Sequence, residues 1–183
     1  MNRIESWRDI HTDLGIFRIA LDTTGALRSG WHHVGDRPEG GTIDSGLLED
    51  VALWIQAFTR GTRRTRPDFR IPQGPPFYRR CWETCRSLAD GEIISYRELA
   101  RRAGRAGAAR AAGAAMRHNP TPLLVPCHRI VRENGRLGGF AGRTGDHDPA
   151  LVLKRRLLEL EDCEPSTGNR RGILFGSQAS SAY

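Results

Sequence analysis

The sequence is poor in lysine, aromatic residues and cysteine, and it contains no long apolar run. Lys154 is the only lysine, so nearly all of the positive charge is carried by arginine. No apolar stretch approaches the ~20 residues that a membrane-spanning helix requires, which argues against a membrane protein. Residues 1–7 lack the hydrophobic region of a signal peptide. We therefore expect an intracellular protein, cytoplasmic and nucleoid-associated if its source is bacterial.

The few cysteines do not suggest a disulfide framework, because thiols stay reduced in such a compartment. Two of them, Cys81 and Cys85, lie one helical turn apart without a second Cys/His pair at zinc-site spacing. We interpret both as small core residues. The acidic and histidine residues near His147 are expected to be solvated. The sequence therefore predicts no metal site and four thiols: Cys81, Cys85, Cys127 and Cys163.

Positive charge is concentrated in the middle of the chain. Residues 60–117 hold fourteen arginines and five acidic residues, whereas the remainder holds fourteen basic and sixteen acidic residues. A basic block beside a nearly neutral remainder indicates a polyanionic partner such as nucleic acid. A solvated arginine-rich surface would give the same composition, so this interpretation depends on the motifs.

The residues before position 60 predict a small α/β lobe. Two apolar segments, residues 15–21 and 26–31, flank the turn-forming residues 22–25 and so indicate an antiparallel hairpin. A helix is expected to begin at a Ser45 cap and to continue through Phe58, because apolar residues recur there at helical spacing. We find no candidate catalytic residue in this part and interpret it as mainly structural.

A linker rich in proline and glycine covers residues 60–76 and places a domain boundary near 70–75. We predict an N-terminal lobe over 1–72, a C-terminal domain over 73–162 and a polar tail over 163–183. The expected fold class is α/β (α+β), in which a small lobe with antiparallel strands is joined to a mostly helical domain.

Two short helices in the basic block predict a helix-turn-helix. Ser95 and Glu98 form a capping box for a first helix that ends at Gly104. The second helix, residues 108–117, consists mainly of alanine and glycine, with Arg110 as its central long side chain. Such a helix suits close approach to DNA and insertion of one side chain into the base stack better than it suits base reading. Tight packing in a core is the alternative.

A thiol and an imidazole follow the apolar run of residues 123–125 in the sequence Pro126-Cys127-His128-Arg129, and we predict that this run is a short buried strand. Burial alone raises the pKa of a thiol and makes it inert, but a neighbouring histidine can accept the proton. Asn119 is placed to hold the preceding turn. Glu161 lies near the C-terminal end of the last helix, where an acid opposes the helix dipole and needs a partner such as histidine. The alternative is a space-filling cysteine beside a solvated histidine.

These motifs resemble those of the O6-alkylguanine-DNA alkyltransferases in order and spacing. The resemblance covers roughly residues 69–161 and rests on Ser95-Tyr96, Ala109-Arg110-Ala111, Asn119-Pro120, Pro126-Cys127-His128-Arg129, Gly138-Gly139-Phe140 and Lys154 with Leu157, Leu158 and Glu161. It implies a cofactor-free DNA repair enzyme that transfers a methyl or larger alkyl group from O6 of a flipped guanine to Cys127, irreversibly and once. The implied partner is double-stranded DNA carrying O6-alkylguanine, bound in the minor groove by a monomer.

The resemblance also implies roles for individual residues. His128 would remove the thiol proton through a water, Glu161 would orient His128, and Asn119 would brace the turn. Tyr96 would hydrogen-bond the guanine and help to protonate it, and Arg110 would fill the gap left by the flipped nucleotide. The other implied DNA contacts are Tyr96, Arg97, Arg105, Ala109 and Arg117, and the implied pocket walls are Met116, Ile130, Phe140 and Ala141.

The sequence departs from the family pattern at Arg143, where glycine is usual, in the added loop 143–149, and at Tyr78, where glutamine is common. No match to the N-terminal zinc ligands of some relatives is found. Three other functions remain open. A non-catalytic lesion-binding protein of the same fold would lack the thiol. A helix-turn-helix regulator with a reactive cysteine needs a base-reading helix. A cysteine hydrolase needs an oxyanion-hole loop, which is not evident.

Overall fold

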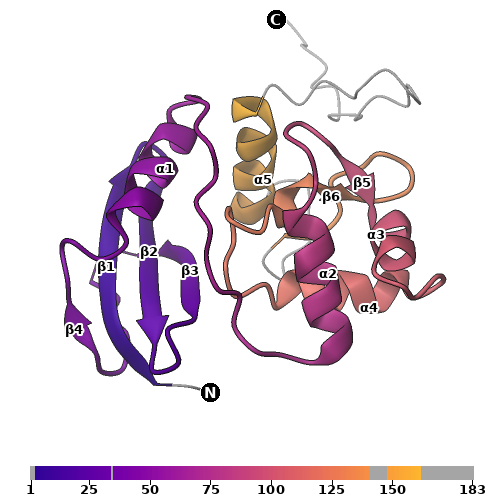
Figure 1. Cartoon of the computed structure of the whole chain (residues 1–183). Helices are drawn as coiled ribbons and strands as arrows, with labels where there is room; N and C mark the ends of the chain where they lie inside the picture. Colours follow the sequence, from indigo (N-terminus) through magenta and orange to yellow (C-terminus); the bar gives the residue numbers. More distant parts are fainter. Residues whose placement is uncertain (1–2, 34, 141–147, 162–183) are drawn as a thin grey trace, which may run out of the picture.

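Four strands and one helix form the N-terminal lobe of the computed structural model, which describes residues 3–33, 35–140 and 148–161. The strand order is β3-β2-β1-β4, with antiparallel pairing except between β1 and β4. Figure 1 shows α1 lying across this sheet. The elements are β1 (Ile4–Thr12), β2 (Gly15–Asp22), β3 (Leu27–His32), β4 (Thr42–Ile43) and α1 (Glu49–Thr59).

The predicted hairpin of residues 15–31 is confirmed as β2 and β3. Its turn is held by Asp22, whose side-chain oxygen accepts hydrogen bonds from the backbone amides of Thr24 (3.0 Å) and Ala26 (3.2 Å). Strand β1 was not predicted. Its most buried apolar residues, Trp7 and Ile10, are three positions apart, so its sequence lacks the alternation that marks a half-buried strand.

Helix α1 begins later than the sequence suggests, and the predicted Ser45 cap is wrong. Leu48 occupies the N-cap in the left-handed region, with φ 47° and no capping side-chain hydrogen bond. The chain before it is turned by Asp44 instead, whose side chain accepts from the amide of Gly46 at 2.9 Å. Two acidic residues in the first turn, Glu49 and Asp50, favour the helix start electrostatically.

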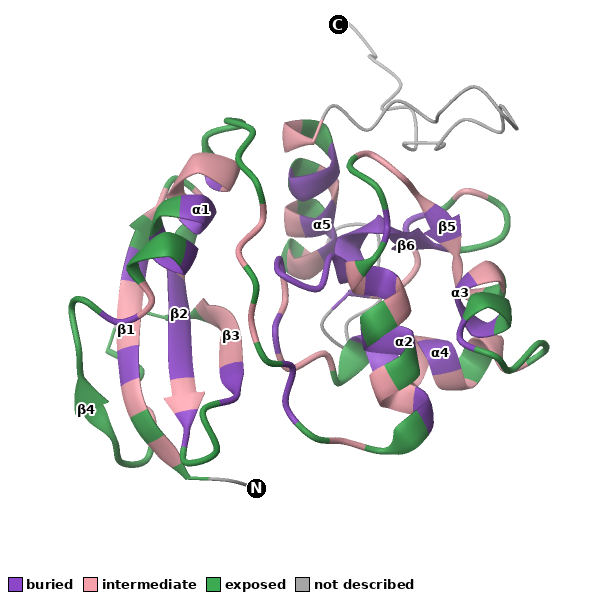
Figure 2. Cartoon of the chain, in the orientation of Figure 1, coloured by how far each residue is buried: buried purple, intermediate pink, exposed green. Residues whose placement is uncertain are grey.

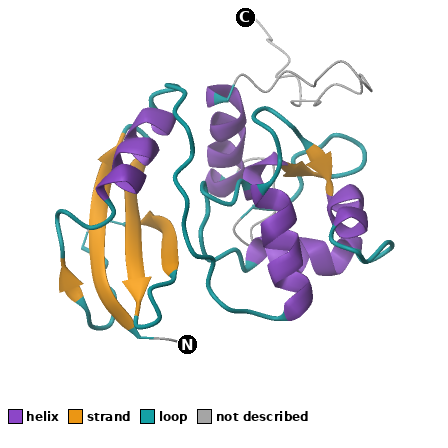
Figure 3. Ribbon diagram, viewed as in Figure 1, coloured by secondary structure: helices purple, strands orange, loops and turns teal. Residues whose placement is uncertain are grey.

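The C-terminal part is mostly helical, with a two-stranded parallel sheet at its centre (Figure 3). Helix α2 packs against both α3 and α4. The buried indole of Trp82 on α2 donates to the backbone oxygen of Ala115 on α4 at 2.8 Å. The elements are α2 (Pro76–Arg86), β5 (Ile94–Ser95), α3 (Tyr96–Arg102), α4 (Ala109–Arg117), the 3₁₀ turn η1 (Cys127–Arg129), β6 (Ile130–Val131) and α5 (Pro149–Leu160).

The two short helices of the basic block form where predicted, as α3 and α4. Half of the expected capping box is present: Ser95 accepts from the amide of Glu98 at 3.1 Å. The carboxylate of Glu98 does not reach back to the cap, because it binds Arg101 and Arg102 at 2.7 Å. Gly104, with φ 78°, follows the end of α3 as expected.

The lobes lie side by side, and Figure 2 shows buried segments on the sides where they face each other. Ser29 on the edge strand β3 donates its amide to Pro120 O (2.9 Å) and its hydroxyl to Pro122 O (3.1 Å). Arg66 in the linker donates to Arg86 O at 2.8 Å. The N-terminal lobe therefore supports the segment that leads to Cys127.

The division at residues 72 and 73 stays a prediction, and the predicted tail 163–183 lies outside the described residues. Within the described ranges, no helix is long and apolar enough to cross a membrane.

Candidate active site

Cys127 is presented by a tight turn and not by the strand that the sequence suggested. Residues 123–125 are buried as predicted, but Leu123 has φ 68° and the amide of Val125 donates to Thr121 O at 2.8 Å. The strand prediction is wrong because the chain reverses direction between Pro122 and Val125, which form an isolated bridge. Apolar residues alone do not distinguish a buried turn from a buried strand.

Asn119 holds this turn from inside. Its side-chain oxygen accepts from the amide of Thr121 at 3.0 Å, and its side-chain nitrogen donates to Val125 O at 2.9 Å. Asn119 also lowers the pKa of the Cys127 thiol, which favours the thiolate. One amide thus fixes the backbone before the cysteine and contacts its sulfur, as expected for a residue that braces the turn.

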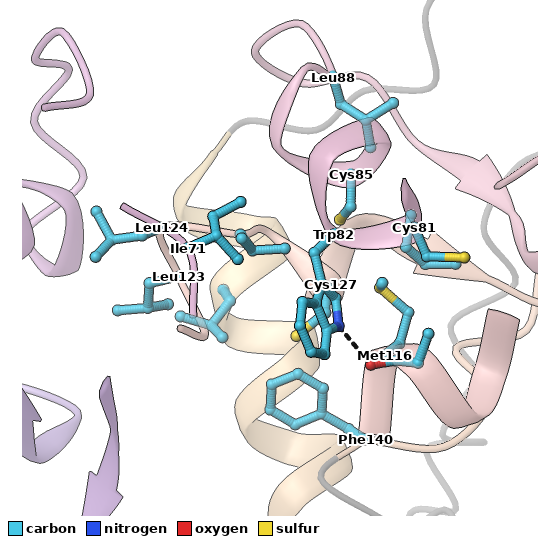
Figure 4. Close-up of a cluster of buried hydrophobic side chains, with 14 of the residues drawn as sticks. Ile71, Cys81, Trp82, Cys85, Leu88, Met116, Leu123, Leu124, Cys127 and Phe140 are labelled. Carbon is cyan, nitrogen blue, oxygen red and sulfur yellow. Dashed lines mark hydrogen bonds between the residues drawn. The ribbon is translucent and has the colours of Figure 1, made fainter. Parts of the chain in front are cut away.

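The sulfur of Cys127 lies in an apolar environment, and its residue is only 7% exposed. Figure 4 shows it among the buried side chains of Trp82, Met116 and Phe140. Burial raises the pKa of the Cys127 thiol, while the Asn119 hydrogen bond, the Lys154 ammonium and nearby backbone amides act in the opposite direction. The thiol is therefore nucleophilic only if a base and a cation assist it.

His128 and Glu161 meet as predicted. His128 is fully buried, its Nε2 lies 3.2 Å from Glu161 Oε1, and its ring packs against the edge of Phe58 with centroids 5.9 Å apart. The Nε2 contact is within ion-pair distance but off the line of a well-formed hydrogen bond. Burial lowers the pKa of His128, and Glu161 opposes that shift. The ring is thus neutral and able to accept a proton.

Lys154 is a functional candidate to which the sequence interpretation gave no role. Its side chain is fully buried on α5, and Nζ donates to Ile130 O and Leu137 O, both at 2.6 Å, and to Gly139 O at 3.5 Å. Burial lowers the pKa of Lys154 to about 8, and the charge of Cys127 opposes this. The sequence did contain a pattern that could have indicated this residue. Lys154 is the only lysine, and it is spaced three residues from Leu151 and from Leu157, on the apolar face of the helix.

Tyr96 lies at the start of α3 with its hydroxyl directed toward the glycine-rich loop, where it donates to Gly139 O at 3.2 Å. The Nζ of Lys154 is 5.8 Å from the ring centroid. Burial and the nearby Cys127 raise the pKa of Tyr96 to about 12, so its hydroxyl remains a proton donor at neutral pH. Tyr96, Lys154 and Cys127 therefore surround one small region of the C-terminal domain.

We expect Gly138→Ala to slow alkylation of Cys127 several-fold by displacing Tyr96. Gly138 has φ 71°, and an added Cβ would lie 3.1 Å from the Tyr96 ring and 3.2 Å from Arg132 Cγ. Gly25→Ala is the matched control, since Gly25 has φ 70° with open space around it. Both changes introduce similar backbone strain, of about 1–2 kcal/mol. Equal alkylation rates in the two variants would contradict the positioning of Tyr96 by this glycine.

Three of the four predicted pocket walls lie in the part of the chain that the structure describes, and their role as walls stays a prediction. Met116, Ile130 and Phe140 are all buried in the same cluster as Cys127. The fourth predicted wall, Ala141, lies outside the described residues. Cys81 and Cys85 are buried free thiols, as predicted for core residues.

The predicted DNA contacts lie on α3, α4 and the turn between them. Arg110 and Arg117 are exposed, and Ala109 is half-buried at the start of α4. The remaining two arginines are exposed but engaged within the protein. Arg97 forms an ion pair with Glu133 at 3.5 Å, and the Arg105 guanidinium lies 5.6 Å from the Phe77 ring centroid. Arg110, the second residue of α4, is thus an exposed basic side chain in the first turn of the helix and not at its centre, where the sequence had placed it.

The sequence of this chain is similar to those of known proteins. Residues 76–163 match the family model described as 6-O-methylguanine DNA methyltransferase, DNA binding domain. The methylated-DNA–protein-cysteine methyltransferase of Shigella flexneri is 48% identical over 69 residues, which is 38% of this chain and 40% of that protein. Its counterpart in Mycobacterium tuberculosis is 42% identical over 121 residues, 66% of this chain and 68% of that protein. This chain belongs to the methylated-DNA–protein-cysteine methyltransferase family.

Solved structures of this family agree with the fold. The Mycobacterium tuberculosis O6-methylguanine methyltransferase has a TM-score of 0.71 at 29% identity, over 89% of this chain and 96% of that chain. The Mycobacterium tuberculosis OGT in complex with DNA has a TM-score of 0.73 at 30% identity, over 88% and 96%. The predicted α/β class is confirmed. The family model extends from the first residue of α2 to beyond α5, so the Cys127 site lies inside it.

Proposed function

We propose that this protein repairs DNA by transferring an alkyl group from O6 of guanine to the sulfur of Cys127. The observation that carries the proposal is the buried thiol of Cys127 beside a neutral His128 that pairs with Glu161, in a chain of the methylated-DNA–protein-cysteine methyltransferase family. A thiolate is a good nucleophile for displacement at carbon. The thioether product is a poor leaving group, so each molecule acts once.

The atoms of this step balance without a cofactor. The sulfur–carbon bond forms while the bond between that carbon and O6 breaks, and the electron pair stays on the guanine. The thiol proton passes through a water to His128, and Glu161 stabilises the resulting imidazolium. Tyr96, whose hydroxyl keeps its proton at neutral pH, donates a hydrogen bond to the guanine and assists its protonation.

The basic surface of α3 and α4 is the proposed DNA-binding element. The described relative with DNA bound and the family model named for DNA binding both support it. We propose that α4 enters the minor groove, where its small residues permit close approach, and that Arg110 replaces the flipped nucleotide. The other proposed contacts are Tyr96, Arg97, Arg105, Ala109 and Arg117. We further propose that the protein acts as a monomer on double-stranded DNA carrying O6-alkylguanine, in the cytoplasm if its source is bacterial.

Stoichiometry tests the proposal. Duplex DNA with a radiolabelled O6-methylguanine is incubated with an excess or a deficit of protein, and protein-bound label is counted. We expect label to reach one equivalent per molecule and then to stop. Label that stays on the DNA with folded protein present would refute alkyl transfer and favour a lesion-binding protein. Label that leaves the DNA beyond one equivalent per molecule without becoming bound to protein would favour a hydrolase.

We expect Arg110→Ala to slow transfer from duplex DNA by tenfold or more while leaving the reaction with a free O6-alkylguanine base unchanged. Only the duplex requires base flipping, so only the duplex reaction needs the side chain that fills the gap. Arg101→Ala is the control, because it removes an equally exposed charge from α3. If both substrates slow equally, or if Arg101→Ala has the same effect, Arg110 acts through general charge and not as a wedge.

A further inference from the structure

We propose that Arg129 is a positioning residue that binds both oxygens of the Glu161 carboxylate, including the oxygen that faces His128, so that His128 stays neutral and keeps its proton on Nε2. The proposal deepens the proposed function and rests on it, because it concerns how the base of that reaction is prepared. Arg129 follows directly after the cysteine and histidine, and its side chain binds Glu161, the partner of His128.

The Arg129 guanidinium is held rigidly on two sides. Its Nε donates to Glu161 Oε2 at 2.7 Å and its Nη2 to Glu161 Oε1 at 2.8 Å, which is a bidentate pair. Its Nη1 donates to Ala89 O at 2.8 Å and to Leu88 O at 3.3 Å. Nη2 also reaches Asp90 Oδ1 at 3.3 Å. Because Arg129 is only 3% exposed, the carboxylate cannot rotate freely away from this fork.

The geometry assigns the two nitrogens of His128 different states. Glu161 Oε1 receives Arg129 Nη2 at 2.8 Å and faces His128 Nε2 at 3.2 Å. A ring nitrogen that faces a carboxylate carries the proton, so the other nitrogen has the free electron pair. His128 Nδ1 is buried and has no hydrogen-bond partner among the described residues. It is therefore the atom available to receive the thiol proton.

The charges around His128 determine whether its Nδ1 is unprotonated and can accept the thiol proton. Glu161 raises the pKa of His128, whereas burial, Arg129 and Lys154 lower it. Phe58 from α1 adds only an uncharged ring edge. Arg66, from the linker, interacts electrostatically with Arg129 and lies 3.8 Å from Asp90. If Arg129 lost its charge, burial and Lys154 would still oppose Glu161, but the pKa of His128 would be higher. A larger fraction of the rings would then be protonated at a given pH, and in those Nδ1 could not accept a proton.

Nitrogen NMR of His128 in the unmodified protein gives the first test. With ¹⁵N-labelled imidazole, two-bond ring correlations distinguish the two tautomers from the imidazolium. We expect the Nε2-protonated neutral ring from pH 6 to 8. A proton on Nδ1, or an imidazolium at pH 7.5, would overturn the proposal. This readout needs no DNA and no transfer, so its failure is separate from failure of the proposed function.

Arg129→Met and Arg129→Lys give the second test. In Arg129→Met we expect the pKa of His128 to rise by about 1–3 units, as for removal of a nearby charge. We also measure the rate of Cys127 alkylation by a haloacetamide as a function of pH. The acidic limb of this pH–rate profile should move to higher pH by the same amount as the pKa of His128. Arg129→Lys keeps the charge and should show the smaller shift, and Arg156→Met on α5 should show none. Slower alkylation with an unchanged limb in Arg129→Met would mean that Arg129 is only structural.

If Arg129→Met does not fold, the double variant Arg129→Met with Glu161→Gln removes both buried charges together and avoids an unpaired carboxylate. We then expect His128 to be neutral with both tautomers populated. An unchanged preference for the Nε2-protonated ring would show that the pair does not set the tautomer.

Discussion

Cys127→Ser abolishes alkyl transfer in this account but leaves DNA binding intact. A serine hydroxyl is close to the thiol in size, yet it ionises far less readily than a thiol and is a much weaker nucleophile for displacement at an alkyl carbon. The changed atom is buried in a residue that is 7% exposed and lies outside α3 and α4, so the proposed DNA-binding surface is unaltered. Transfer is measured with radiolabelled duplex DNA, and affinity is measured by fluorescence anisotropy at fixed salt.

Cys85→Ser is the matched control for this experiment. Cys85 is a fully buried free thiol on α2, and burial raises its pKa well above the ordinary value without the assistance of a histidine neighbour. We expect Cys85→Ser to transfer one equivalent, at some cost in stability. One equivalent of label on Cys127→Ser would mean that another cysteine is the acceptor.

Lys154→Met slows thiol alkylation by about ten- to a thousandfold at neutral pH, because a nearby opposite charge supplies about 1–3 units of pKa. The Lys154 ammonium lowers the pKa of Cys127, and its hydrogen-bond acceptors in the described ranges are backbone carbonyls rather than carboxylates. Its charge therefore remains available to the thiolate. The rate of haloacetamide alkylation as a function of pH measures this directly. Its alkaline limb should move to higher pH in Lys154→Met.

Arg156→Met is the control on the same helix, since Arg156 is exposed and pairs with Glu159 at 3.3 Å. It should leave the alkaline limb in place. An unshifted limb in Lys154→Met would contradict an electrostatic role and leave Lys154 as a structural clamp for the carbonyls of Ile130 and Leu137.

The pH dependence of stability gives Lys154 a second signature. In the folded protein the pKa of Lys154 falls from its ordinary value of 10.5 to about 8. Between these values the unfolded chain binds the proton more tightly, so this residue contributes increasing stability as pH rises from about 8. Lys154→Met should lack that contribution. The free energy of unfolding is measured at pH 7 and at pH 10 for the unmodified protein and for Lys154→Met. The difference between their two pH-dependent changes isolates the contribution of Lys154, because the other titrating groups are common to both proteins.

Local sequence patterns predicted those parts of the molecule that local interactions determine. The turn of the β2–β3 hairpin is stabilised by a hydrogen bond between two of its own residues, Asp22 and Thr24. Helix α3 begins at a serine N-cap and is followed by Gly104. The meeting of His128 with Glu161 was also predictable, because an acid at a helix C-terminus needs a compensating partner. The family resemblance supplied the roles, which local patterns alone could not give.

The remaining features depend on contacts between distant segments. The turn at Leu123 exists because Asn119 bonds both of its sides, which no hydropathy pattern records. Arg129 binds the carboxylate of Glu161, which lies 32 positions further along the chain. Lys154 donates hydrogen bonds to backbone carbonyls in the segment that follows Cys127. For arginine and lysine, sequence favours exposure, and only the structure shows that these two are buried with their partners.

Mass spectrometry of the protein after reaction with duplex DNA containing a single O6-methylguanine tests the central claim most directly. The account predicts that the intact mass increases by one methyl group in place of one hydrogen, and that fragmentation locates it on the sulfur of Cys127, while guanine is restored in the DNA. An unchanged mass for folded, DNA-bound protein, or a methyl group on Cys81, Cys85 or Cys163, would contradict it.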